Sequence, residues 1–382
     1  MAIILIVGVG LIYWQWQKEK LVLRNDYQNL LSIRSGLDVS LASMSADLAL
    51  LKAEDQRVKN DKLMAEVKQI NITFKSALTQ YEDLIDLRES GVKTNKLDVL
   101  YGPILTDLAK MDYAGATIKV ATLSAKIKEE KEKSLPTVGG VNLANVVESN
   151  AAPGSGFSRQ KVKVAEQFFV VDIVAADLSN TKVIVDTASD GDCADNCPVL
   201  PLGTYVSRNG ASAGINGSYF CPATYPACAN KKNSFDTLLM NKNKKYFNSD
   251  NNVYSTVPAV IFSGSSVRFV SQSLQWGRDT GVDSVLANYP LLVSGKNLAT
   301  GDSSDEKLAA TGNRAFVANK GNMVYIGVVR GVSVVGAGKV LVAMGMDNAL
   351  NLDSGGSTAL WSGGYKYGPG RDIPNAILFV KR

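Results

Sequence analysis

The sequence predicts an α+β protein in which a membrane-proximal helical, coiled-coil region precedes a C-terminal domain built on a mixed β-sheet. Three observations support this division. A leucine-rich heptad pattern lies within residues 17–135, and glycine, proline and small residues follow over residues 136–156. From residue 157 to residue 382 the apolar residues recur with the period of strands. A length of 382 residues also favours two or three domains.

The first 16 residues are predicted to form a hydrophobic membrane anchor. The apolar run from residue 2 to residue 14 is shorter than the about 20 residues that a bilayer helix needs. However, Trp14 and Trp16 lie where an aromatic belt would, and no small-residue cleavage site follows before Lys18. The positive charges after the run would place that side in the cytoplasm. We give the cysteines more weight and predict a membrane-anchored, extracytoplasmic protein, on the periplasmic or cell-surface side.

Residues 17–135 are predicted to be a helical stalk or bundle. Steps of four and three residues define a heptad seam at Leu37, Leu41, Met44, Leu48 and Leu51. The seam resumes from Leu63 to Ile85, and Ser35–Gly36 is a candidate break. Shorter helices are expected over residues 96–111 and 114–133. Because the seam must be buried, either these helices fold back over it or a second copy of the chain covers it, which would make a homo-oligomer.

Residues 136–156 are predicted to be a flexible linker to the C-terminal domain, residues 157–382. Within that domain, β-branched and aromatic residues predict strands over residues 168–174, 182–186, 257–262, 266–270, 314–318, 323–329 and 376–380. One helix is expected over residues 337–344. The mixture of strands and a helix is the basis for the α+β assignment.

The composition excludes several classes of function. The chain has no histidine, so neither a Ser-His-Asp triad nor an imidazole-ligated zinc site can form. Proton transfer is left to carboxylates and a few other side chains, as in glycosidases. The net charge of +5 is modest, and nucleic acid is therefore not an expected partner.

All four cysteines lie close together in the sequence, at Cys193, Cys197, Cys221 and Cys228. A four-thiolate zinc site is conceivable, but the spacings differ from the usual tight pairs. Two disulfides fit better and indicate an oxidising compartment. Local pairs and crossed pairs both remain open.

The stretch Asn351–Thr358 is the leading candidate for a functional site. It follows an apolar run and joins an aspartate, Asp353, to two glycines and several hydroxyl side chains. Glycine tolerates the positive φ angles of a sharp turn, and such a turn exposes backbone N–H groups beside the carboxylate. This is equipment for an oxygen-rich ligand such as a sugar or a phosphodiester. A capped hairpin turn is the plain alternative.

Three further junctions, and a glycine-containing segment that follows the leading stretch, support that candidate. They are residues 213–221 with an Asn-Gly pair, residues 288–295, residues 312–318 with Arg314, and residues 368–371 with Arg371. Each of them alone is weak evidence. Together they supply two guanidinium groups, which could form the bidentate contacts that a phosphodiester needs.

Taken in order, these stretches resemble the phosphodiester glycosidase family over residues 157–382. The similarity rests on Ile215–Phe220, Pro290–Val293, Arg314, Asn351–Ser357 and Arg371–Ile377. Two positions depart from the family pattern. Ser354 replaces a glycine and fits only if its φ is not strongly positive, and Ala315 replaces a threonine.

The resemblance implies hydrolysis of a sugar phosphodiester or a related glycosidic bond in envelope or exopolysaccharide glycans. Asp353 is the expected catalytic carboxylate. The residues expected to bind the glycan or sugar phosphate are Asn216, Gly217, Asn288, Arg314, Ser354, Gly355, Gly356, Ser357 and Arg371. A second carboxylate could be Asp172, Asp186 or Asp283. The alternative is a non-catalytic surface protein that binds glycans or builds an envelope layer or filament on the helical stalk.

No metal or other cofactor is expected. Aspartates cluster near the first cysteines, at Asp186, Asp190, Asp192 and Asp195, and residues 248–252 form another oxygen-rich loop. Neither segment has the spacing of an EF-hand, so solvated turns are the favoured interpretation and calcium is the alternative.

Overall fold

The computed structural model describes residues 2–89, 92–134, 146–248, 255–301 and 305–382. The side chains of residues 2–9, 11–12, 89, 131–134 and 306 are outside this description. The chain divides into two compact units, Met1–Ile72 and Thr73–Arg382. The second unit thus includes the end of the long N-terminal helix as well as the sheet domain, whereas the sequence places a domain boundary near residue 156.

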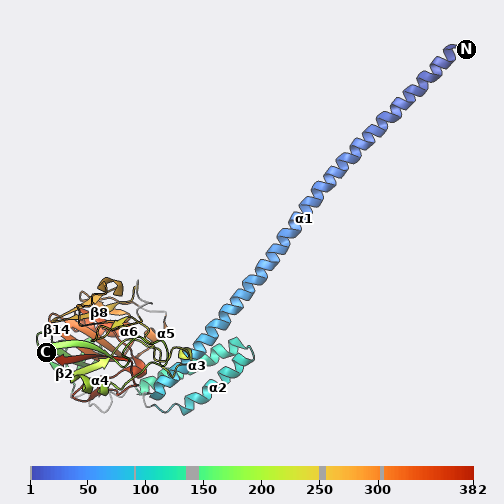
Figure 1. Cartoon of the computed structure of the whole chain (residues 1–382). Coiled ribbons are helices and arrows are strands. Elements are labelled where there is room, and N and C mark those ends of the chain that lie inside the picture. The colour runs from blue at the N-terminus through green and yellow to red at the C-terminus, as the bar shows by residue number, and fades with distance from the viewer. Residues whose placement is uncertain (1, 90–91, 135–145, 249–254, 302–304) are drawn as a thin grey trace. The chain divides into compact units, whose positions relative to one another are not determined.

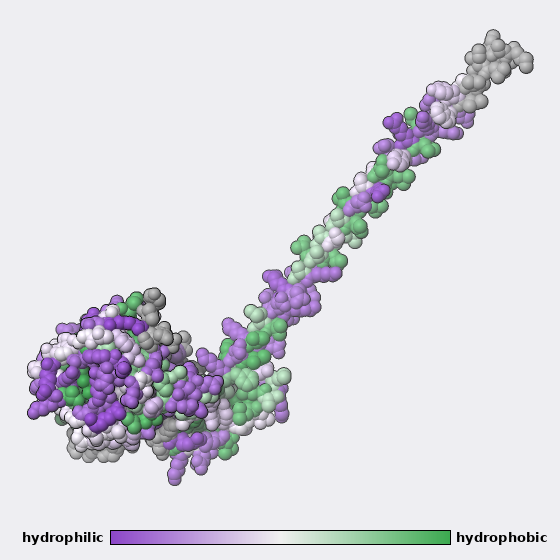
Figure 2. Space-filling model, viewed as in Figure 1, coloured by the Kyte–Doolittle hydropathy of each residue, from purple (hydrophilic) through white to green (hydrophobic). Residues whose placement is uncertain are grey.

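Helix α1 (Ala2–Glu89) supplies the whole of the first unit. It continues through Ser35 and Gly36, so the candidate break is wrong. Every side chain from Tyr13 to Gln69 is exposed, and the seam residues Leu37 and Met44 keep 65% and 68% of their surface accessible. Figure 2 shows apolar residues in green recurring along this helix between polar stretches in purple. The first part of the seam is therefore not covered by the described residues of its own chain.

The predicted membrane anchor falls at the start of α1. Among the helices that the structure describes, none has an apolar stretch of the length that crossing a membrane requires. Most side chains of residues 1–16 are outside the described ones. The anchor therefore stays a prediction.

The helical part of the second unit is a small bundle. The last turns of α1, from Thr73, pack with α2 (Asn95–Ala109) and α3 (Tyr113–Ser134), which fold back on them (Figure 1). The bundle core is apolar and includes Leu84, Ile104, Leu123 and Ile127. For this last part of the seam, the intramolecular alternative is confirmed.

The remainder of the second unit confirms the α+β class and contains three sheets. The eight-stranded sheet has the order β1-β2-β3-β14-β13-β15-β11-β12. Its strands are β1 (Val147–Glu148), β2 (Gly156–Val164), β3 (Gln167–Asp177), β11 (Leu291–Ser294), β12 (Asn297–Leu298), β13 (Gly312–Lys320), β14 (Met323–Val332) and β15 (Asn348–Asn351). The pairing of β1 with β2 is parallel and the other pairings are antiparallel, so the sheet is mixed.

Two five-stranded antiparallel sheets complete the domain. One has the order β17-β16-β5-β18-β4, with strands β4 (Thr181–Thr187), β5 (Ala213–Asn216), β16 (Leu360–Ser362), β17 (Tyr365–Tyr367) and β18 (Asn375–Lys381). The other has the order β7-β6-β10-β8-β9, with strands β6 (Leu239–Met240), β7 (Tyr246–Phe247), β8 (Ala259–Ser263), β9 (Ser266–Val270) and β10 (Ser284–Ala287).

The helices cover the sheet faces that the main core leaves free. In β13, Ala315 and Val317 enter the core shared with the five-stranded sheets, while Phe316 and Ala318 point to the other face. Helix α6 (Val334–Ala343) packs on that second face, and α4 (Leu202–Asn209) packs on the sheet that contains β4. This alternation along one strand is what a sheet buried on both faces requires.

The end of the predicted linker and the four cysteines are part of the folded domain. Of the predicted linker 136–156, residues up to 145 lie outside the described ones, whereas Val147–Glu148 pair with β2 and Gln160 donates to the carbonyls of Ser149 and Ala151. The last half of this segment is thus part of the domain. The cysteines form the two local disulfides, Cys193–Cys197 and Cys221–Cys228.

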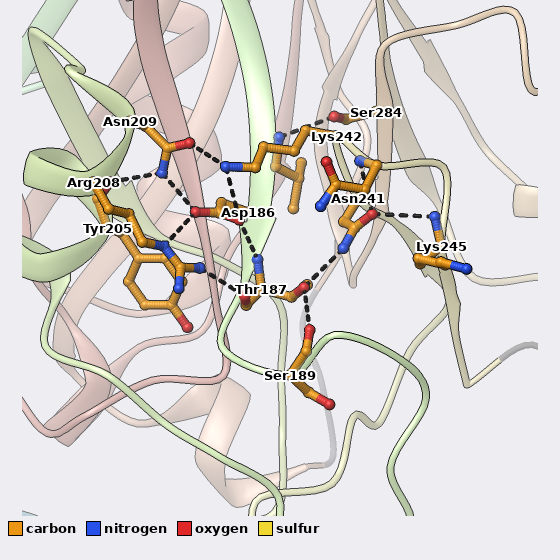
Figure 3. A network of polar contacts seen from close by, with 12 residues as sticks. Asp186, Thr187, Ser189, Tyr205, Arg208, Asn209, Asn241, Lys242, Lys245 and Ser284 are labelled. Carbon is orange, nitrogen blue, oxygen red and sulfur yellow. Dashed lines mark hydrogen bonds and ion pairs between the residues drawn. The ribbon is translucent and has the colours of Figure 1, made fainter.

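A buried polar network fastens β4 to α4 (Figure 3). The Asp186 carboxylate accepts hydrogen bonds from Arg208 at 2.7 Å and Asn209 at 2.5 Å, and Lys242 lies 3.4 Å away. Arg208 also donates to the carbonyl of Thr187. Because Asp186 is almost fully buried, its charge depends on these partners.

We therefore expect Asp186→Ala to lower the free energy of unfolding by about 3 kcal/mol, because Arg208 and Lys242 would lose their common partner in a partly buried position. Urea denaturation followed by tryptophan fluorescence would measure the loss. Asp190→Ala is the matched control, since Asp190 is exposed, and it should change stability by no more than about 0.5 kcal/mol. Equal midpoints for the two variants would contradict this account.

Candidate functional site

The candidate loop joins β15 to β16 through a short 3₁₀ turn, Gly355–Ser357. Ser354 has extended backbone angles, with φ −138°, so a serine fits where the family has glycine. Gly355 has φ +65°, which favours glycine. The turn is therefore possible with a single glycine in the left-handed region.

Asp353 lies at the start of this loop, where backbone groups and a hydroxyl group form hydrogen bonds with it. Its N–H donates to the carbonyl of Gly217 at 2.9 Å, and its carboxylate accepts from the N–H of Ser354 at 2.9 Å and from the Ser357 hydroxyl. Burial, with a smaller contribution from the charge of Asp86, raises the pKa of the Asp353 carboxyl to about 7, although Ser357, Arg371 and the Ser354 N–H act in the opposite direction. Asp353 can thus exchange a proton near neutral pH.

Asn216, a predicted ligand residue, holds both ends of the loop. It is fully buried at the end of β5. Its amide nitrogen donates to the carbonyl of Asp353 at 2.6 Å, and its amide oxygen accepts from the N–H of Ala359 at 3.0 Å. Since backbone groups already use both polar atoms, we interpret Asn216 as a positioning residue for Asp353.

Gly217 and Asn288 have similar supporting contacts. A methyl group on Gly217 would lie 1.8 Å from the side-chain oxygen of Asn375, so glycine is required for space. The buried Asn288 accepts from the N–H of Tyr219 at 3.0 Å and donates to the carbonyl of Asn351 at 2.8 Å. Both residues connect the strands that carry the loop.

Two tyrosines that were not among the predicted site residues line the site. The rings of Tyr219 and Tyr289 lie 4.9 Å apart, and Asn351 donates to the Tyr219 hydroxyl at 2.6 Å. Burial, reinforced by the charge of Asp353, raises the pKa of Tyr219. Tyr219 belongs to the Ile215–Phe220 motif, so its position in that motif could have identified it.

The two arginines have different roles in the geometry. The buried Arg314 donates to the carbonyls of Lys307 at 2.9 Å, Val332 at 3.3 Å and Ala310. Its positive charge acts to lower the pKa of Tyr219. Arg371 donates its backbone N–H to the carbonyl of Gly356 at 2.8 Å. Its guanidinium pairs with Asp86, and its positive charge lowers the pKa of the Asp353 carboxyl.

The structure thus brings Asn216, Arg314, Asp353 and Arg371 into one neighbourhood at the edge of the sheets. The proposed second carboxylates lie elsewhere. Asp172 pairs with Arg159 and Arg330, Asp186 belongs to the network in Figure 3, and Asp283 lies 2.9 Å from Lys182. Each of them is paired with basic side chains of its own, which does not favour that role, and the choice of a second carboxylate stays a prediction.

Asp86 of α1 is the carboxylate that approaches Asp353, and it comes from outside the sheet domain. It pairs with Arg371 and accepts from the Tyr225 hydroxyl at 2.6 Å. A methyl group built on Gly355 would lie 3.2 Å from its Oδ2 atom, so its carboxylate lies over the loop. No pattern in the sequence links Asp86 to Asp353.

The acidic and cysteine side chains bear on whether a metal ion could bind. Within the described part of the chain, no group of three or more acidic or cysteine side chains is placed to hold a metal ion. Residues 249–252 of the second oxygen-rich loop lie outside that part. The calcium alternative stays untested.

The fold and the site define an α+β domain with a candidate active centre at a carboxylate in a glycine-containing turn. Residues 209–380 match the family model described as phosphodiester glycosidase. Comparison with the curated proteins gives no match.

Several solved structures are similar to parts of the chain. A hypothetical protein from Synechocystis is 13% identical over 59% of this chain and 62% of its own length, less than two thirds, with a TM-score of 0.42. The catalytic domain of zebrafish N-acetylglucosamine-1-phosphodiester alpha-N-acetylglucosaminidase, described as auto-inhibited by its pro-peptide, is 16% identical over 62% and 87%, with a TM-score of 0.48. A putative exported protein of Burkholderia pseudomallei is 11% identical over 56% and 74%, with a TM-score of 0.37.

The raised pKa of Asp353 predicts a pH-dependent stability. The folded protein keeps this proton up to about pH 7, whereas the unfolded chain releases it near pH 4, so stability should fall as the pH rises between these values. Asp353→Asn cannot titrate. The stability of the wild type relative to this variant should therefore decrease from pH 4 to pH 8 in urea denaturation. A constant difference would contradict the pKa assignment.

Proposed function

We propose that the C-terminal domain hydrolyses the bond between a sugar and the phosphate of a sugar phosphodiester. The proposal rests on the carboxyl of Asp353, which has a pKa of about 7 and belongs to the loop to which Arg371 donates its backbone N–H, with the positive charge of Arg371 close enough to lower that pKa. A proton-transfer group whose pKa is near the working pH is the most effective. A neighbouring guanidinium suits the phosphate group.

In this proposal Asp353 acts as the general base. Ionised Asp353 takes a proton from a water molecule, and the water oxygen forms a bond to the anomeric carbon. The bond from that carbon to the phosphate oxygen breaks, and its electron pair leaves with the phosphate monoester. Because Arg371 stabilises the departing anion, the leaving group needs no proton, whereas the attacking water must lose one. The free sugar and the phosphate monoester are the products.

The remaining predicted residues fit supporting roles. Ser354 and Ser357 hold the carboxylate, and Gly355 and Gly356 keep the turn free of side chains beside it. Arg314 braces the segment before β13 and adds positive charge near Tyr219. We propose that the glycan part of the substrate also binds at this turn.

The proposed setting is extracytoplasmic. Both disulfides are consistent with an oxidising compartment, because such bonds persist there. Envelope or exopolysaccharide glycans are the proposed substrates, and anchoring of residues 1–16 to a membrane would keep the domain near them. These points rest on the cysteines and the apolar N-terminal run.

Asp353→Asn is expected to lower kcat for a p-nitrophenyl sugar phosphodiester by at least about 100-fold, because the attacking water would lose its base. In the wild type, kcat/KM should rise with pH and level off above about 7. Sugar release from pH 5 to pH 9 would measure both effects, with Asp190→Asn as the matched control. A rate that falls through pH 7 would make Asp353 a proton donor instead. An unchanged rate in Asp353→Asn would remove it from the mechanism.

The non-catalytic alternative makes a different prediction in the same experiments. A glycan-binding protein would bind members of a glycan array but would release no sugar from any phosphodiester. Binding without turnover would decide for that alternative.

We also propose that the first unit self-associates through its seam. A single helix in water gains little stability by itself, and Leu41 and Leu48 are 70% and 53% exposed. A second copy of the chain would bury both.

The double variant Leu41→Asp/Leu48→Asp should shift the full chain to monomer in sedimentation equilibrium, because each change places charge in the seam. The matched control, Ala42→Asp/Ala49→Asp, adds the same charge one residue further round the helix and should stay associated. A wild type that is monomeric at all concentrations would overturn the proposal.

A further inference from the structure

One face of α1 presents two acidic side chains to the candidate site. Glu82 and Asp86 are four residues apart, so they lie on the same side of the helix. Glu82 pairs with Lys307 at 2.6 Å, and Asp86 pairs with Arg371. All four residues belong to the second compact unit. Two anions of the helix thus neutralise two cations of the sheet domain.

Tyr225 lies between these two pairs. Its hydroxyl donates to Asp86 at 2.6 Å, and its ring lies 5.1 Å from the guanidinium of Arg371 and 4.9 Å from the ammonium of Lys307. Tyr225 belongs to the short loop closed by the disulfide Cys221–Cys228. Burial, together with the charge of Asp86, raises the pKa of its hydroxyl, which therefore remains a hydrogen-bond donor.

Arg371, Tyr225 and Lys307 together have the chemistry of an oxyanion site. They supply a guanidinium and a hydroxyl donor, which contact Asp86, and an ammonium, which contacts Glu82 one helical turn away. The carboxylate of Asp86 contacts Arg371 and Tyr225, and it lies over Gly355 and close enough to Asp353 to repel its charge. A ligand anion bound here would lie next to the proposed base.

We propose that Arg371, Tyr225 and Lys307 form the anion subsite of the candidate site, and that Asp86 and Glu82 occupy it as internal ligands that a phosphate group displaces. The identification of the displacing anion as a phosphate group rests on the proposed function. The subsite itself rests on the contacts of the helix. Its ligand class is a sugar carrying a phosphate.

A phosphate can displace the carboxylates of Asp86 and Glu82 because their ion pairs add little net stability. The side chains of Glu82, Asp86 and Arg371 are 7%, 22% and 10% exposed, so their pairing must offset the loss of water. A phosphate offers more negative charge and more acceptor oxygens than one carboxylate. It can therefore compete for the same three donors.

The test measures the binding of phenyl phosphate to the full chain by isothermal titration calorimetry at low salt. Asp86→Asn should bind at least about 10-fold more tightly than the wild type, and Glu82→Gln/Asp86→Asn more tightly still, because the internal anions are removed. Arg371→Gln should weaken binding at least about 10-fold, and Tyr225→Phe should weaken it by less. Asp55→Asn is the matched control, since it removes the same charge from an exposed pair on α1 and should bind as the wild type does.

Two results would overturn the proposal. One is binding by Asp86→Asn that is no tighter than that of the wild type, and the other is binding by Arg371→Gln that is unchanged. Because the titration requires no turnover, it separates this inference from the proposed function. Tighter binding by Asp86→Asn without hydrolysis of any phosphodiester would support the subsite and refute the hydrolase. Hydrolysis by the wild type with equal binding in all variants would do the reverse.

The kinetic readout adds a second distinction. If the wild type hydrolyses the p-nitrophenyl sugar phosphodiester, Asp86→Asn should lower KM by about the same factor as it tightens phenyl phosphate binding. The kcat/KM profile should also shift to lower pH, because Asp353 would lose a repelling neighbour. Loss of turnover in Asp86→Asn would instead show that Asp86 takes part in the reaction, and the proposal would be wrong.

Discussion

The site depends on one buried amide, that of Asn216. Its two polar atoms bond the backbone at Asp353 and at Ala359, so a single side chain fixes the start and the end of the loop. A buried amide that satisfies both its donor and its acceptor stabilises one conformation strongly, since any other arrangement leaves polar groups unpaired. The position of the Asp353 carboxylate, and therefore its burial and its raised pKa, follow from this anchor.

Local patterns predicted several of the strands and helices that bury apolar residues, but they did not predict α4 or the fully buried strand β10. The run 266–270 matches β9, and the helices expected after residue 95 match α2 and α3. The convergence of Asn216, Arg314, Asp353 and Arg371 was also predictable, but only because the family motifs occur in order. The separate roles of Asn216 and Arg371 could not be predicted, because in the sequence both are simply polar residues near strand ends. What each side chain bonds is decided by long-range packing.

The aspartates show why a carboxylate in the sequence is a weak indicator of a catalytic residue. Asp172 and Asp186 lie within strands and are buried, and each is matched by two cationic side chains. Asp353 is held instead by a backbone N–H and a hydroxyl, and the nearest arginine also pairs with Asp86. Incomplete compensation of its charge is what leaves its pKa near 7. Composition and spacing do not distinguish these environments.

The charge of Asp86 links helix α1 to the proposed hydrolysis. Asp86 repels the charge on Asp353 and helps to raise its pKa. A phosphate bound in place of Asp86 would put at least one negative charge at the same position, so the pKa of Asp353 would remain raised when ligand replaces the helix. An internal anion that imitates the charge of the ligand therefore keeps the base in a similar protonation state before and after binding. A neutral sugar could not do this, because its binding would leave Arg371 without an anionic partner at the site.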